Sequence, residues 1–176
     1  MANELLLRFY RGEGTDDVGR RIGDIWRYSR DELEDVHDYI QWLFPLAERS
    51  AFNPGAPLLD AATMAEFRRD NALRENVERS FEVMLGFYGL TLAGDHIARA
   101  PDFADRSRLW LSPGNHNFLR LTRILKSLSL LGHEASAKSL LGCLEELYRE
   151  RPGVIGSTTV GYWRRATSPA VAPGGA

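Results

Sequence analysis

The sequence predicts an all-α protein, a single-domain, non-repeating bundle of six or seven helices. Three observations support this fold class. Apolar residues recur at intervals of three and four positions along most of the chain, which is the helical spacing. Runs with the alternating or β-branched pattern of strands are missing, apart from "TTV" and scattered pairs. No segment repeats with a period of roughly 20 to 50 residues, so a solenoid is excluded.

The size and charge of the chain suit one compact domain. Its 176 residues are 44% apolar, which is enough to bury a sizeable core. We expect residues 1–167 to form the domain and residues 168–176, "SPAVAPGGA", to be a disordered tail. Because 22 basic and 24 acidic residues give a formal net charge of −2, the composition excludes a strongly basic nucleic-acid-binding protein and a strongly acidic one.

Cysteine usage and hydropathy predict a cytoplasmic location. The lone Cys143 cannot form an internal disulfide, and no Cys/His cluster has the spacing of a zinc site, so we expect no metal and no cofactor. No stretch approaches the roughly 18 consecutive apolar residues of a membrane span. The start, "MANELLLRFYRGEG", contains Glu4 and too short an apolar run for a signal peptide.

The first half of the chain predicts three helices. The first has Asp16 or Asp17 as a cap and carries apolar residues at helical spacing: Val18, Ile22, Ile25 and Trp26. The second begins near residue 30, at the capping box of Ser29 and Glu32, and continues to Pro45. Its buried stripe is Leu33, Val36, Ile40, Leu43 and Phe44. After a loop, Asp60 caps a short third helix through residue 69.

The second half predicts three longer helices and a short last one. "DNALRENVERSFEVMLGFYG" has a wide apolar arc and ends at Gly89, which indicates a central helix. Residues 90–112 show no sustained period, so we expect a long irregular connection that either carries function or contains a short helix. Ser112 and Pro113 open a helix that ends at Gly132. "EASAKSLLGCLEELYRE" follows as an amphipathic helix, and "STTVGYWRRA" is the last.

Trp42 is the first candidate binding residue. On one continuous helix it lies about 180° from the apolar stripe, on the side of Asp31, Asp35 and Asp38. An aromatic ring among carboxylates attracts a cation, an amine or an arginine. The alternative is that another helix covers Trp42 and supplies the basic partner internally.

The helix from residue 113 raises two further points. Its apolar face leaves Leu119 and Leu130 on the far side, so this helix is either buried on both sides or presents a mixed basic and apolar patch to a partner, including a second copy of the chain. Near its start, His116 and Asn117 lie where free backbone amides can hold an anion, with Arg120 one turn later. Capping and loop anchoring are the alternative roles of these side chains.

Signs of catalysis are weak. Glu34 and His37 have the Glu-x-x-His spacing of di-iron bundles, but the second pair that such a site needs is missing, so a structural histidine is favoured. No nucleophile elbow, zinc-protease, phosphate-loop or dinucleotide-binding motif occurs. The sequence therefore predicts a protein that is not an enzyme.

Three segments, "LEDVHDYIQWLFPL", "FEVMLGFYGL" and "NHNFLRLTRILKSLSLLG", together resemble the conserved N-terminal region of the opioid growth factor receptor family. The resemblance runs from about Phe9 to Tyr148. It implies the properties described for animal members: binding of the opioid pentapeptide enkephalin, restraint of cell proliferation, association with the nuclear envelope and a long C-terminal region. It implies no catalytic residues. We expect this chain to be a short, stand-alone homologue.

The leading hypothesis is a non-enzymatic module that binds a peptide or protein segment. A peptide amino terminus and aromatic side chain would suit a site made of Asp35, Asp38, Tyr39 and Trp42. The peptide carboxylate would suit Arg120 or Arg123, and His116 and Asn117 are further candidate ligand-binding residues beside them.

Two alternative functions stay open. One is an enzyme or small-ligand protein with a polar pocket formed by Glu34, His37, His116 and Arg120. The other, which the net charge disfavours, is nucleic-acid association through Arg120, Arg123, Lys126, Arg164 and Arg165.

Overall fold

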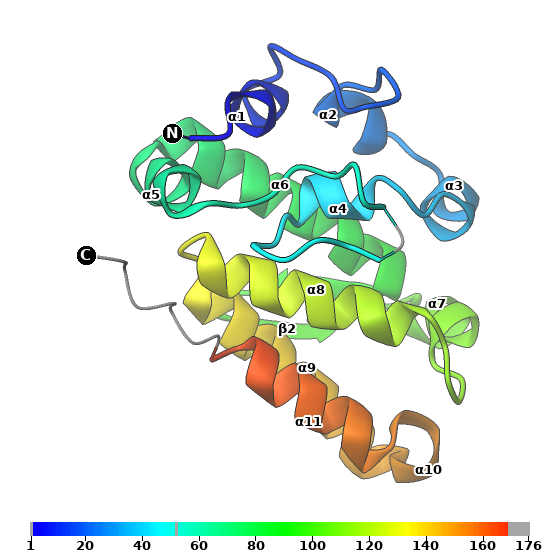
Figure 1. Cartoon of the computed structure of the whole chain (residues 1–176). Coiled ribbons are helices and arrows are strands. Elements are labelled where there is room, and N and C mark those ends of the chain that lie inside the picture. The colour runs from blue at the N-terminus through cyan, green and yellow to red at the C-terminus, as the bar shows by residue number, and fades with distance from the viewer. Residues whose placement is uncertain (1, 52, 169–176) are drawn as a thin grey trace.

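The structure, a computed structural model, describes residues 2–51 and 53–168 (Figure 1). Within these ranges the protein is a mostly helical, non-repeating single domain with one two-stranded sheet, which confirms the all-α fold class. Its elements are α1 (Glu4–Tyr10), α2 (Ile22–Ile25), α3 (Arg30–Asp35), α4 (Ile40–Leu43), α5 (Ala61–Arg69), α6 (Asn71–Tyr88), β1 (Leu90–Ala93), β2 (His96–Arg99), α7 (Phe103–Trp110), α8 (Asn117–Leu130), α9 (Glu134–Glu150), α10 (Pro152–Ile155) and α11 (Ser157–Ala166). Helices outnumber the prediction because α1, α7 and α10 are additional and the predicted second helix is divided into α3 and α4.

Helix α6 is the central helix that the sequence predicts. The Asp70 side chain caps its start by accepting from the backbone amides of Ala72 and Leu73, and Gly89 ends it with a φ of 72°. Helices α1, α5 and α7 and strand β1 all pack against α6. Its wide apolar arc is therefore buried on several sides, at Leu73, Val77, Phe81, Met84, Leu85, Phe87 and Tyr88.

Helices α8, α9 and α11 form a second group, which lies below α6 in Figure 1. The Trp163 indole of α11 donates from Nε1 to the Phe118 carbonyl of α8 at 3.1 Å, and the two rings meet edge to face. Because the indole N–H has this partner, the large Trp163 ring can be fully buried in the contact between α8 and α11.

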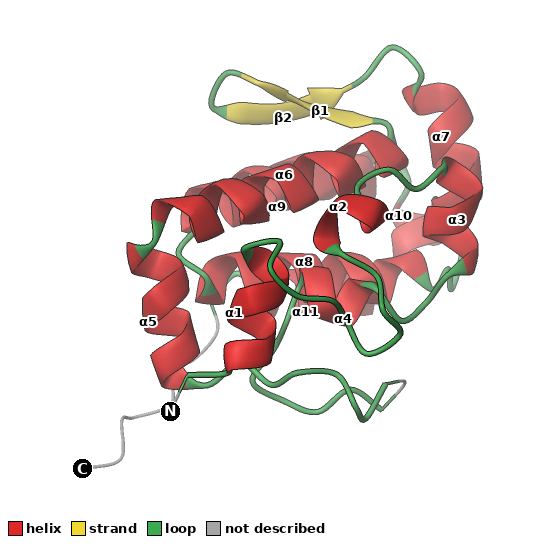
Figure 2. Ribbon diagram, turned by 90° about the horizontal axis from the view of Figure 1, so that it is seen from above, coloured by secondary structure: helices red, strands yellow, loops and turns green. Residues whose placement is uncertain are grey.

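The segment 90–112 is more ordered than the sequence predicts. Strands β1 and β2 pair in antiparallel register around the two-residue turn Gly94–Asp95, and α7 follows. Figure 2 shows the hairpin beside α6 and α9, and contacts of β1 with α6 and of β2 with α9 agree with this view. The predicted irregular connection is wrong for the hairpin, whereas the short helix named as its alternative is confirmed as α7.

The predicted continuous helix from residue 30 to Phe44 is also wrong. Helix α3 ends at Asp35, because Val36 is extended with φ −85° and ψ 125°, and the chain becomes helical again only at Ile40. A helical wheel drawn across this break therefore misplaces Trp42, which is buried, although Ile40, Leu43 and Phe44 are buried as predicted. The break decides how residues 33–46 meet α8.

The start of α8 differs from the prediction as well. Ser112 and Pro113 lie in a turn, and the helix begins four residues later at Asn117. The Asn115 side chain accepts from the backbone amide of Asn117, which gives the helix a different cap from the predicted one. Of the predicted tail, 168–176, all but Ser168 lies outside the described residues. Within the described part of the chain, no helix has the length and apolar content to cross a membrane.

A basic groove between α4 and α8 as candidate functional site

Arg120 connects α8 to the break between α3 and α4. Its guanidinium is buried and donates to three backbone carbonyls: Leu33 at 2.7 Å, Glu34 at 3.1 Å and Val36 at 3.0 Å. These carbonyls lie where α3 ends, so they lack the helical partners that a continuing helix would give them. The five N–H donors of one arginine replace those partners. Arg120 is thus engaged inside the fold, so it is not a free anion ligand.

Two histidines extend this junction to the surface. Arg120 donates to Nδ1 of His37 at 2.7 Å, which places the neutral ring's proton on Nε2. The exposed rings of His37 and His116 meet edge to face, with centroids 5.4 Å apart. Glu34 lies on the other side of His116, with Oε1 3.3 Å from Nε2, and Oε2 accepts from the buried Asn117 amide at 3.0 Å. Burial lowers the pKa of His116, so the ring is mainly neutral near pH 7.

An open groove of about 680 Å³ adjoins this junction. Apolar side chains line part of it, namely Ile40, Leu46 and Leu119, and Leu119 is 59% exposed. The other lining residues are His37, Gln41, Ser50, His116, Arg120, Thr122, Arg123 and Lys126. No carboxylate of the described residues lines this groove, so a basic edge faces an apolar wall.

The charges of this edge are only partly compensated. Arg123 donates from one nitrogen to the Phe44 carbonyl at 3.0 Å, and burial lowers its pKa without removing its charge near neutrality. Lys126 forms an ion pair with Glu48. Burial raises the pKa of Glu48, but hydrogen bonds from Lys126 and the backbone, together with the charges of Lys126 and Arg123, lower it overall. The Arg123 and Lys126 side chains therefore form the basic edge of the groove.

A second groove, of about 710 Å³, continues the first across α8. Thr122 and Lys126 line both grooves. Tyr162 lines the second one, is 52% exposed and carries the Arg165 guanidinium over its ring at 4.9 Å. Arg164 lines it too and pairs with Glu145 at 2.6 Å. The two grooves make one basic and apolar surface across α4, α8 and α11.

The predicted acidic and aromatic site does not form. Trp42 is 4% exposed, contacts Phe9 and donates from Nε1 to Asp17 at 2.9 Å. Tyr39 is fully buried, and its hydroxyl donates to the Leu33 carbonyl. Because of the helix break, Trp42 faces the core. This agrees with the alternative that other parts of the chain cover Trp42, although its partner is the acidic Asp17 and not a basic residue.

The carboxylates of that site are not used as predicted. Asp38 pairs with Arg20 at 2.7 Å, and Asp35 is exposed on α3. The structure instead brings together His116, Asn117 and Arg120 from the other predicted site, together with Glu34 and His37. Only Asn117 and Arg120 of these are buried, and both anchor the junction. Sequence reasoning did not find Ile40, Gln41, Leu46 or Ser50 as groove residues.

The predicted patch of Leu119 and Leu130 is half correct. Leu119 is exposed in the groove, but Leu130 is only 9% exposed and belongs to the core. Among residues 2–51 and 53–168, no group of three or more histidine, cysteine or acidic side chains is arranged to hold a metal ion.

Comparison with known proteins extends this picture beyond the single chain. Residues 2–167 match the family model described as the opioid growth factor receptor (OGFr) conserved region. The chain belongs to this family. Arg120, the two histidines and the groove thus lie within the region that defines the opioid growth factor receptor family.

Several relatives match over most of the chain. The human opioid growth factor receptor is 42% identical over 158 residues, which are 84% of this chain and 23% of the relative. The mouse receptor is 42% identical over 135 residues, 73% of this chain and 21% of the relative. Opioid growth factor receptor-like protein 1 of Xenopus tropicalis is 38% identical over 134 residues, 73% of this chain and 26% of the relative. The chain thus spans about a fifth to a quarter of these relatives. No solved structure matches it.

Proposed function

We propose that this chain is a non-enzymatic module that binds a peptide or protein segment in the groove between α4 and α8. The observation that carries the proposal is the groove itself: an exposed apolar side chain, Leu119, stands beside a basic edge with no lining carboxylate. Apolar anchors and a few fixed charges are what peptide-binding grooves use. The names of the relatives, which include the word receptor, agree with a binding role.

The lining also indicates the chemistry of the bound segment. An apolar side chain of the segment would pack on Leu119, Ile40 and Leu46, and an acidic group would pair with Arg123 or Lys126. The second groove adds Tyr162 and Arg165 in line with the first. A segment with apolar and acidic residues in alternation therefore fits better than the amine-terminated aromatic end expected for the buried Trp42.

A second candidate is a small-ligand protein or enzyme. The observation in its favour is that Glu34 and His37 lie at one junction with His116 and Arg120, although about eighty positions separate the two pairs in sequence. Against catalysis, Arg120 is already committed to backbone carbonyls. A ligand at this junction would contact Nε2 of His37 and the exposed part of His116.

The test is selection of displayed peptides on the purified chain, followed by affinity measurements with single variants. Leu119→Asp places a carboxylate on the apolar wall. We expect this variant to bind the selected peptides at least tenfold more weakly, because an apolar contact is lost and an acidic peptide is repelled. Leu5→Asp is the matched control, since Leu5 is 68% exposed on α1 and lies outside the groove. We expect this control to bind within twofold of the wild-type chain.

Two further ligands in the same binding assay separate peptide binding in the groove from the alternative functions. The enkephalin pentapeptide tests the ligand that the family resemblance implies. A single-stranded oligonucleotide tests nucleic-acid binding, which would weaken steeply with added salt. Selected peptides that bind Leu119→Asp and the wild-type chain equally would refute the groove as the binding site.

A further inference from the structure

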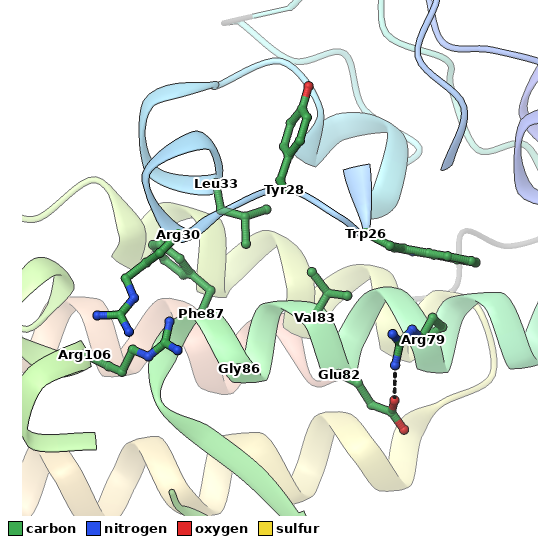
Figure 3. A pocket seen from close by; sticks show the side chains of 10 residues that line it. All are labelled: Trp26, Tyr28, Arg30, Leu33, Arg79, Glu82, Val83, Gly86, Phe87 and Arg106. Carbon is green, nitrogen blue, oxygen red and sulfur yellow. Dashed lines mark hydrogen bonds and ion pairs between the residues drawn. The ribbon is translucent and has the colours of Figure 1, made fainter. Parts of the chain in front are cut away.

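A third groove, of about 450 Å³, shares no lining residue with the first two (Figure 3). It lies between the segment that joins α2 to α3, the outer face of α6 and α7. Its lining residues are Trp26, Tyr28, Arg30, Leu33, Arg79, Glu82, Val83, Gly86, Phe87 and Arg106. Among the described residues, the lining thus has three guanidinium groups, three aromatic side chains and one carboxylate, Glu82, while the Asp102 carboxylate binds Arg106 from outside the lining.

The three arginines are not equally available. Arg79 pairs with Glu82 at 3.4 Å at one end of the groove. Figure 3 shows Arg30 and Arg106 at the other end, with their guanidinium groups turned toward one another beside Phe87. Arg106 donates from Nε to Asp102 at 2.6 Å, which keeps its two terminal nitrogens free for another acceptor. Arg30 has no hydrogen-bond acceptor among the described residues.

The positions of these two arginines are fixed by different elements. Arg30 opens α3, whose capping box of Ser29 and Glu32 sets the start of the helix. Arg106 belongs to α7, and its Cβ and Cγ lie over Gly89, so close that a Cβ added there would come within 2.7 Å. Both act on Asp102: the hydrogen bond from Arg106 lowers the pKa of this carboxyl, and the charge of Arg30 adds to the effect. Two guanidinium forks from two helices therefore converge at one end of the groove.

The remaining walls suit a flat apolar group. Trp26 and Tyr28 are half-buried, and the Trp26 indole is held by a hydrogen bond from Nε1 to Ser80 at 3.0 Å. Gly86 leaves room between them and the arginines, because a Cβ added to Gly86 would meet nothing within 4 Å. A volume of about 450 Å³ lies within the range of roughly 300–1,000 Å³ for small-molecule sites.

We propose that this groove binds a phosphate monoester that carries a planar ring. Two guanidinium forks offer more donors than the two oxygens of a carboxylate use, and they match the three terminal oxygens of a phosphoryl group. The ring would lie along α6 against Leu33 and Val83, which stand between the two arginines and Trp26, whereas the Tyr28 ring points away from α6 (Figure 3). This site is independent of the peptide groove, so either proposal can fail without the other.

The experiment is calorimetric titration of the full chain at fixed ionic strength with phenyl phosphate, inorganic phosphate and benzoate. We expect saturable one-to-one binding of phenyl phosphate, at least tenfold tighter than either fragment alone. Equal affinity for benzoate and phenyl phosphate would overturn the phosphate assignment, and equal affinity for inorganic phosphate would overturn the ring contact.

Two variants test the location with matched controls. Arg30→Ala should weaken the affinity for phenyl phosphate at least tenfold. Arg27→Ala is the control and should change this affinity less than twofold, because the Arg27 side chain is 75% exposed and pairs with Asp24. Gly86→Leu fills the groove without removing a charge and should abolish binding, whereas Gly142→Leu, also at an open helical position, should not. Circular dichroism of each variant checks that the fold is kept. Unchanged affinity in both Arg30→Ala and Gly86→Leu would place the ligand elsewhere and refute the site.

Two sources of such an ester can be separated with the same titration. A peptide with phosphotyrosine and adenosine monophosphate each join a phosphoryl group to a ring. If one of these two ligands binds more tightly than phenyl phosphate, it identifies the source: the peptide indicates a modified protein, and adenosine monophosphate indicates a nucleotide. If the peptide, the nucleotide and phenyl phosphate all fail to bind, the proposal is overturned.

Discussion

Arg120 supplies hydrogen bonds that the backbone of α3 cannot obtain from its own chain, since the helix stops at Asp35. The guanidinium also lies over the Tyr39 ring at 5.7 Å. A buried carbonyl without a partner costs about 1–3 kcal/mol. One side chain thus allows a sharp break in the main chain to lie inside the core.

We predict that Arg120→Lys lowers the free energy of unfolding by about 2–4 kcal/mol, because a lysine has one nitrogen and cannot serve three carbonyls and His37 together. Urea unfolding followed by circular dichroism measures the loss. Arg27→Lys, at an exposed surface ion pair, is the control and should change stability by less than about 0.5 kcal/mol. Equal unfolding midpoints for the two variants would contradict the role given to Arg120.

His133 gives the protein a pH-dependent stability. Its side chain is 3% exposed, Nε2 has no partner among the described residues, and Nδ1 lies 3.6 Å from Glu78. Burial lowers its pKa to about 4, with Arg74 and Arg68 acting in the same direction and Glu134 against it. The folded state therefore binds fewer protons than the unfolded state between pH 6.5 and about 4.

We predict from this that the contribution of His133 to the free energy of unfolding is constant above pH 6.5. It falls as the pH drops toward about 4, by on the order of 2 kcal/mol. Thermal unfolding between pH 5 and pH 7.5 measures the fall. His133→Gln removes the titrating group, so its stability should be flatter over this range than that of the wild-type chain. Parallel curves for the two proteins would show that His133 does not control the effect.

At the scale of elements, Gly89 connects the end of α6 to both the hairpin and α7. Its φ of 72° favours glycine, and an added Cβ would approach Arg106 and the Phe103 Cα to 2.7 and 2.9 Å. We predict that Gly89→Ala destabilises the protein by about 2 kcal/mol or more, through backbone strain and overlap. Gly142→Ala in α9 should stabilise it by up to about 1 kcal/mol. Chemical denaturation of both variants checks the pair, and a stabilised Gly89→Ala would contradict it.

The sequence predicts elements well where local periodicity and packing agree. Helices α6 and α9 show this, since their apolar faces and flanking residues match the observed helices. The hairpin was missed although Gly94–Asp95 is a two-residue turn signal, because its strands are only four residues each and contain few β-branched residues. The break after α3 could not be predicted, because the local pattern is helical and a distant arginine stabilises the alternative.

The candidate site was predicted in part for a similar reason. His116, Asn117, Arg120 and Arg123 lie close together in sequence, so their grouping followed from one helix. Glu34 and His37 join them through contacts across more than eighty positions, for which a single sequence holds no signal. Trp42 was misplaced because its predicted direction depended on the unbroken helix. Leu46 and Ser50 fall in irregular chain, where side-chain direction follows no period.

At the scale of the whole molecule, exposed apolar side chains are scattered. Leu5, Val18, Leu92, Leu109, Leu119 and Tyr162 lie on several separate elements or loops. A standard interface buries about 800 Å² on each partner, with several apolar residues at its centre. With Leu130 in the core, Leu119 lacks the second leucine that the predicted self-association required.

We therefore predict a monomer, with a mass of 19.8 kDa by light scattering at micromolar concentrations. Leu119→Asp should leave this mass unchanged, while it weakens peptide binding. A mass that doubles with concentration in the wild-type chain and not in Leu119→Asp would show a homodimer built on this groove instead.

The bonds from Arg120 to Leu33 and from Ser127 to Pro45 join positions separated by 87 and 82 residues. A ribosome adds roughly 5–20 residues each second, so the early segment is made several seconds before α8 exists. During that interval Leu33, Ile40 and Leu43 lack the cover they have in the finished protein. Nascent chains stalled before residue 117 should thus be the forms of this protein that chaperones hold most tightly.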